Sequence, residues 1–155
     1  MQTRTRHAVI IGFIAVVALV WFFWDSPERA IRAVLAEGAS AIEAKDLGAA
    51  MSQVSRQYLD ENGLNYLAVR RVLGWAFNRF QQLEVRMYDV RIDINAERAT
   101  ATAMLKVVLT ANGRERHSLV GASGLPEPVT FILAKEPLAW KVVSVNGIDI
   151  SRVQY

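Results

Sequence analysis

The sequence of 155 residues contains no cysteine and only two histidines. The absence of cysteine excludes disulfide bonds and thiolate metal ligands, but it does not fix the compartment, because many exported proteins also lack cysteine. The two histidines, His7 and His117, stand far apart, and no aspartate-rich loop accompanies either of them. We therefore predict no metal site and no cofactor.

A motif for acid–base or nucleophilic catalysis is also missing. A Ser-His-Asp triad would have to use His117, which follows the polar run 113–116 and is typical of an exposed strand or loop. Residues 121–124 (GASG) resemble a phosphate-binding loop, but neither the required lysine nor a helix pattern follows them. We assign no catalytic residue and favour a protein without enzymatic activity.

Charge of one sign is scarce as well. The net charge is +3, and basic and acidic residues alternate along the chain without forming a block. This pattern is typical of a solvated surface, whereas a phosphate-binding stripe would cluster its basic residues. We expect no binding to nucleic acid.

Residues 8–24 (AVIIGFIAVVALVWFFW) hold no charge. As a helix they would extend roughly 25 Å, close to the thickness of a bilayer core, and their aromatic end suits the lipid–water interface. A cleaved signal peptide would need small residues after the apolar run, where this chain has bulky aromatics followed by Asp25-Ser26-Pro27. We predict an uncleaved anchor in the lipid bilayer.

The domain organisation follows from this anchor. We predict a short cytoplasmic tail (1–7), a transmembrane anchor (8–24) and a soluble domain (26–155). Basic residues are nearly balanced across the anchor, with Arg4 and Arg6 before it and Arg29 and Arg32 after it. We place the short tail in the cytoplasm, so that the domain lies outside, in the periplasm, on a single-pass inner-membrane protein.

Helical periodicity precedes strand periodicity in the domain. Apolar spacing predicts a helix from about residue 26 to 43, a short one after Asp46 and a long one from about 64 to 82. Alternation then predicts strands at 83–94, 99–110, 116–120, 129–135 and 139–145, with a β-bulge near residues 87–88 where the apolar phase shifts. The order favours an α+β domain with three helices packed on a curved antiparallel sheet.

Several local phrases carry a family resemblance. The short helix ending near Tyr58-Leu59-Asp60, the pair VRIDI and ATATAMLKVVL, and the closing strand with Trp140-Lys141-Val142 resemble the nuclear transport factor 2-like superfamily, which includes ketosteroid isomerase-like and polyketide cyclase-like proteins. The resemblance covers roughly 26–149 and implies a cone-shaped domain, often with an apolar pocket. No residue here matches the family's catalytic positions. In layout the chain also resembles the inner-membrane scaffold subunit of type IV secretion systems.

Two sets of residues are candidates for binding. Aromatic side chains would line a pocket of the cone, or else fill its core. The alternating C-terminal tail after Asn146-Gly147, together with one tryptophan, would contact a partner, although the tail pairs equally well with its own sheet. The pocket candidates are Tyr58, Tyr66, Trp75, Phe77, Phe131 and Trp140, and the interface candidates are Trp75, Ile148, Ile150, Val153 and Tyr155.

Two functions remain open at this point. We favour a non-catalytic interaction or accessory subunit of a membrane-associated assembly, bound to other proteins or to copies of itself. The alternative is a domain that binds or transforms a small apolar ligand in the cone pocket, as an isomerase or cyclase would.

Overall fold

The computed structural model describes residues 26–111, 115–120 and 125–148 of the chain. The predicted tail 1–7, the predicted anchor 8–24 and the interface candidates Ile150, Val153 and Tyr155 lie outside these ranges. Within them, no helix is both long enough and apolar enough to cross a membrane.

Three helices form where helical periodicity predicts them: α2 (Pro27–Glu43), α3 (Leu47–Ser52) and α4 (Tyr66–Arg79). Asp46 caps α3 by accepting a hydrogen bond from the backbone N–H of Ala49 at 2.9 Å. Asn65 caps α4 in the same way, by accepting a hydrogen bond from the N–H of Ala68. The helix begins and ends slightly inside the predicted range of about 64 to 82. Ser26 occupies the cap position of α2, and the sequence Ser26-Pro27-Glu28 is typical of a helix start, but the serine side chain makes no capping bond.

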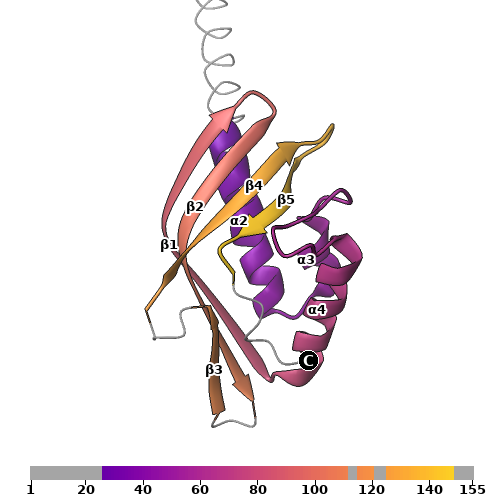
Figure 1. Ribbon diagram of the computed structural model, residues 1–155, viewed down its shortest axis with the longest axis vertical. Helices are drawn as coiled ribbons and strands as arrows, with labels where there is room; N and C mark the ends of the chain where they lie inside the picture. The colour runs from indigo at the N-terminus through magenta and orange to yellow at the C-terminus, as the bar shows by residue number, and fades with distance from the viewer. Residues whose placement is uncertain (1–25, 112–114, 121–124, 149–155) are drawn as a thin grey trace, which may run out of the picture.

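The strands are β1 (Gln82–Asn95), β2 (Arg98–Ala111), β3 (Glu115–Val120), β4 (Glu127–Lys135) and β5 (Trp140–Asn146). They form one antiparallel sheet in the order β1-β2-β4-β5, and β3 pairs with the end of β2 that β4 does not reach. Figure 1 shows α2 lying along the sheet, with α3 and α4 next to each other on the side of β5. The predicted α+β class with an antiparallel sheet is confirmed.

A β-bulge bends β1. The pairing of β1 with β2 shifts register between Tyr88 and Arg91, and Asp89 adopts a left-handed conformation with φ of 50°. Leu83 and Met87 pack in the core before the bulge, and Ile92 packs there after it. The predicted bulge is confirmed. Alternation with Val90, Ile92 and Ile94 would predict that Tyr88 points into the core, but Tyr88 precedes the bulge and is 43% exposed.

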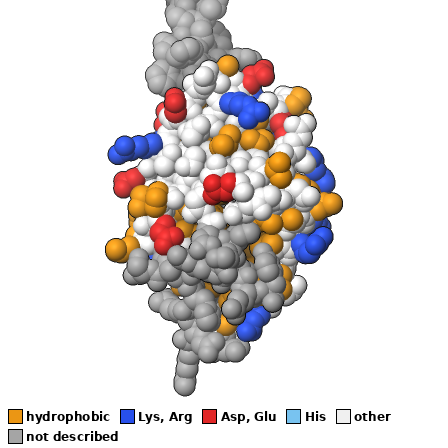
Figure 2. All heavy atoms as spheres, in the orientation of Figure 1, with side chains coloured by type: hydrophobic (Ala, Val, Ile, Leu, Met, Phe, Trp, Pro, Cys, Tyr) orange, Lys and Arg blue, Asp and Glu red, His pale blue; other side chains and the backbone are white. Residues whose placement is uncertain are grey.

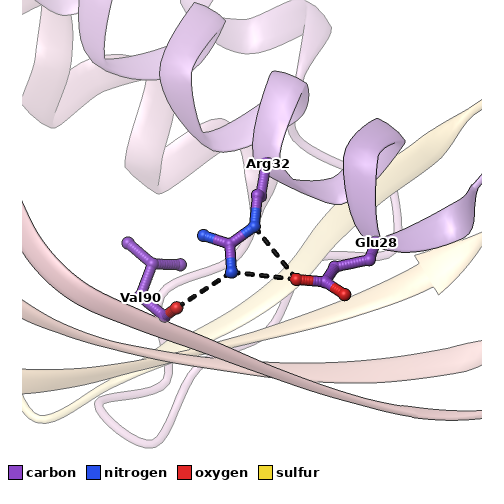
Figure 3. A network of polar contacts seen from close by, with 3 residues as sticks. All are labelled: Glu28, Arg32 and Val90. Carbon is purple, nitrogen blue, oxygen red and sulfur yellow. Dashed lines mark hydrogen bonds and ion pairs between the residues drawn. The ribbon is translucent and has the colours of Figure 1, made fainter.

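A side chain of α2 holds this bulge. Arg32 donates hydrogen bonds to the Glu28 carboxylate at 2.9 and 3.1 Å and to the carbonyl oxygen of Val90 at 3.2 Å (Figure 3). A bulge leaves backbone groups without ladder partners, so a guanidinium that reaches one of them ties the helix to the bend.

Two hydrophobic clusters fill the space between the helices and the sheet. Ile31 of α2 and Leu133 of β4 are central to the first cluster, and both are fully buried. The second cluster lies around Phe80, Leu105 and Val129. Residues that pack against both clusters join them into one core; they are Met87, Phe131 and Val145.

Candidate binding surfaces

The fold brings four of the six aromatic pocket candidates to the first hydrophobic cluster. Tyr58, Tyr66 and Trp140 are buried within it, and Phe131 packs against it while also touching the second cluster. Trp75 and Phe77 instead lie partly buried against the second cluster, so the six do not share one site.

Trp75 meets Phe80 edge to face, with ring centroids 5.8 Å apart and an interplanar angle of 85°. This geometry is favourable for aromatic pairs, and it holds the indole against the end of α4. The interface candidate Ile148 also packs against the second cluster. Whether any of these residues bind a ligand or a partner stays a prediction.

Tyr58 is an ionisable residue within the first hydrophobic cluster, and its ring is buried. Its hydroxyl donates a hydrogen bond to Oδ2 of Asp60 at 3.2 Å. Burial of the ring raises the pKa of Tyr58 well above its ordinary value, and the negative charge of Asp60 raises it further. The hydroxyl is therefore protonated at neutral pH and acts as a donor.

Asp60 uses its other oxygen to shape the loop between α3 and α4. Oδ1 accepts hydrogen bonds from the backbone N–H groups of Asn62 and Leu64, both at 2.9 Å, and Gly63 takes a positive φ of 78° within the turn. The Tyr58–Asp60 pair thus serves the backbone of this loop, which is a structural role.

Ser55 has a comparable role one turn earlier. Ser55 is the one buried residue with a polar, non-aromatic side chain among the residues that the structure describes. Its hydroxyl accepts a hydrogen bond from the N–H of Gln57 at 3.0 Å. The Arg56 guanidinium lies 4.4 Å from the centre of the Tyr66 ring, a cation–π contact that joins the loop to α4. The described polar groups near the interior hold the loop in place.

A hollow of about 170 Å³ lies on the other side of the sheet. Alternation places Glu84, Arg86 and Tyr88 on one face of β1, and the register sets Lys106 opposite Arg86 and Val108 opposite Glu84. We call these five residues the outer hollow. None of these five residues was predicted as a site residue from the sequence, although the alternation of Glu84, Arg86 and Lys106 with apolar neighbours is visible in both strands.

The outer hollow places two cations side by side. Arg86 and Lys106 stand directly opposite across the strand pair, where like charges repel. Glu84 offsets this repulsion, since its carboxylate accepts a hydrogen bond from Nε of Arg86 at 2.5 Å. Hydrogen bonds to Glu84 and then to Tyr88 raise the pKa of Arg86, which stays charged under all ordinary conditions. Such a site suits an acidic or hydrogen-bonding group on a partner.

The visible surface around the sheet is mixed in character. Figure 2 shows hydrophobic side chains in small groups between charged and uncharged polar ones. Among residues 26–111, 115–120 and 125–148, no three histidine, cysteine, aspartate or glutamate side chains are placed to hold a metal ion. His7 and the side chain of His117 lie outside what the structure describes.

No protein-family model matches the sequence, and no curated protein sequence matches it. Solved structures do match the fold. A proposed aromatic ring hydroxylase from Novosphingobium aromaticivorans superimposes with a TM-score of 0.67 and 11% identity over 81% of this chain and 94% of its own. A proposed scytalone dehydratase from the same bacterium superimposes with a TM-score of 0.66 and 12% identity, over 76% of this chain and 80% of its own.

A third match names the fold itself. It is a nuclear transport factor 2-like protein with a cystatin-like fold, also from Novosphingobium aromaticivorans, with a TM-score of 0.61 and 13% identity over 90% of this chain and 96% of its own. The described part of this chain therefore has the nuclear transport factor 2-like, cystatin-like fold, in agreement with the resemblance in its sequence. Identities this low show the fold alone.

Proposed function

We propose that this protein is a membrane-anchored interaction subunit. Residues 8–24 span the inner membrane, and the domain lies in the periplasm, where the outer hollow binds an acidic segment of a partner protein. One observation carries the proposal: the described polar groups of the interior support the loop between α3 and α4, whereas the outer hollow offers two adjacent cations and a tyrosine at the surface.

The anchor and the orientation can be tested directly. We expect the N-terminal sequence of the mature protein to begin before residue 8, and protease added to intact spheroplasts to digest the domain. A mature chain that begins near Ser26 would contradict the anchor, and a protected domain would contradict the orientation.

The partner surface is tested with a photo-crosslinking amino acid at Tyr88 in native membranes. Leu67 on α4 is the matched control, because it is also a large exposed apolar residue, 62% exposed, but belongs to a helix and not to the sheet. We expect an adduct at position 88 and none at position 67. An adduct at twice the mass of the chain would identify the partner as a second copy.

Charge reversal sharpens this experiment. Arg86→Glu should abolish the Tyr88 adduct, because it places a second acidic side chain beside Glu84, where the partner's acid would bind. Arg91→Glu is the control, since Arg91 is exposed on the same strand beyond the bulge. Equal adducts in both variants would show that the outer hollow does not bind the partner.

A second candidate function is the binding of a small apolar ligand. It is favoured by the four aromatic residues gathered at the first cluster and by the fold shared with proteins proposed to be a hydroxylase and a dehydratase. Native mass spectrometry of the purified protein tests it. A stoichiometric small molecule that is lost on Phe131→Ala would favour this function over the first.

A further inference from the structure

One end of the domain gathers the start of α2 and two β-turns (Figure 1). The turn between β1 and β2 lies at residues 95–98, and the turn between β4 and β5 lies at 136–139. A hydrogen bond from the N–H of Lys135 to the carbonyl oxygen of Glu97, at 2.8 Å, joins the two turns. The three features therefore form a single end of the molecule.

Two contacts relate the position of the turn at 95–98 to the start of α2. Glu43 of α2 accepts a hydrogen bond from the N–H of Val85, and Arg32 donates one to the carbonyl of Val90, so α2 runs antiparallel to β1. Beyond the second contact, β1 continues to Asn95 for roughly 16 Å, whereas α2 continues back to Pro27 for roughly 8 Å. The turn at 95–98 thus projects beyond the start of the helix.

The apolar segment 8–24 ends directly before this end of the domain. Only Asp25 separates it from Ser26, the cap position of α2. An anchor joined by so short a link leaves no room for the domain to stand away from the bilayer. Whatever projects beyond the start of α2 then meets the lipid headgroups.

The turn between β4 and β5 is apolar at its tip. Leu138 is 100% exposed, and its neighbours Pro137 and Ala139 are exposed too. A hydrogen bond from the N–H of Glu136 to the carbonyl oxygen of Ala139 closes the turn at 2.9 Å and holds the leucine outward. A single exposed leucine is ordinary on a protein surface, but this one lies at the end that the anchor would bring to the bilayer.

We propose that this end of the domain rests on the lipid surface and that Leu138 enters the headgroup region. The inference depends on the proposed anchor. The turns carry charges of both signs, at Glu97, Arg98, Lys135 and Glu136, so the contact does not require anionic lipid. A domain held by the anchor and by Leu138 has a fixed orientation, and Arg86 then stands roughly 30 Å along β1 from the headgroups.

The natural absence of cysteine makes a clean test possible. The full-length chain carrying Leu138→Cys is labelled with an environment-sensitive fluorophore and reconstituted into phosphatidylcholine vesicles, with and without phosphatidylglycerol. Gln82→Cys is the control, because Gln82 is exposed at the opposite end of β1.

We expect lipid-borne nitroxide to quench the label at Leu138, and aqueous iodide to quench it roughly threefold less than the label at Gln82, in both kinds of vesicle. Equal quenching by iodide at the two positions would overturn the inference. Carbonate extraction of the same vesicles separates the two failures. A chain that is extracted lacks the anchor, and both proposals fall, whereas a retained chain with equal quenching overturns the lipid contact alone.

Discussion

Phe131→Ala distinguishes a filled core from an open pocket. Phe131 lies on β4 between Ala101 of β2 and Val145 of β5, and it packs against both hydrophobic clusters. If the side chain fills the core, its removal leaves a cavity where the clusters join. If it lines a pocket, its removal widens space that is already open.

The magnitude follows from the position of the ring. Truncation of a buried phenylalanine to alanine costs about 3–5 kcal/mol. Phe131 is partly buried, so we expect about 3 kcal/mol, or roughly 10 °C in the melting temperature of a domain of this size. The loss is largely in cavity formation, because Phe131 makes no polar contact through its ring.

The assay is urea unfolding of residues 26–155, followed by circular dichroism. We expect this fragment to unfold cooperatively, since it contains every described residue of both hydrophobic clusters. Leu138→Ala is the control, and its complete exposure predicts a change within about 0.5 kcal/mol. A loss below about 1 kcal/mol for Phe131→Ala would refute the filled core and support the small-ligand function.

Three further predictions concern the loop between α3 and α4 and the end of β5. Asp60→Ala should lower the free energy of unfolding by about 3 kcal/mol in the same assay, because it leaves two backbone N–H groups and the Tyr58 hydroxyl without their acceptor. Asp93→Ala, at an exposed site, is the control. Equal losses in the two variants would contradict this role of Asp60. The raised pKa of Tyr58 means that folding favours the neutral phenol, so this contribution to stability is complete below the unfolded-state pKa of about 10 and declines above it. The free energy of unfolding should therefore fall above that pH, less steeply in Tyr58→Phe than in Tyr88→Phe, and identical slopes would exclude the effect. Gly147→Ala should destabilise the domain by about 2 kcal/mol or more, because φ is 92° and a Cβ would lie 2.8 Å from the carbonyl oxygen of Pro128. Gly63→Ala is the control. Its φ is also positive, at 78°, but a Cβ there would meet open space, so it should cost about 1 kcal/mol. Thermal melts of the two variants compare them, and equal losses would exclude the contact with Pro128.

The order of the elements was predictable because each boundary has a local cause. Asp46 caps α3 as expected, and the change of apolar period from helical to alternating marks the start of β1 at Gln82. A shift in the phase of the apolar residues predicted the bulge, but it did not identify the residues that form it. Asp89 takes the left-handed conformation, and Tyr88 consequently remains on the outer face with Arg86. Alternation alone does not show which residues a bulge absorbs.

The outer hollow was not predictable, because it depends on pairing between strands. Arg86 and Lys106 are distant in the sequence and become neighbours through the register of β1 with β2, which the turn at 95–98 and the bulge set together. The buried face of α4 was predictable only in part. Helical periodicity predicts one apolar stripe along this helix. Of that stripe Phe80 is buried as expected, but Val72 is only partly buried.

The edges of the sheet narrow the ways in which a partner can bind. Segment 53–59 covers β5: the N–H of Ser55 donates to the carbonyl of Val142 at 2.9 Å, and that of Leu59 donates to Val143 at 3.0 Å. At the other edge, Glu43 and Arg32 satisfy backbone groups of β1 at Val85 and Val90. A strand added at either place would have to displace these contacts. The outer hollow lies away from these edge contacts, so a partner bound there, as we propose, would leave them in place.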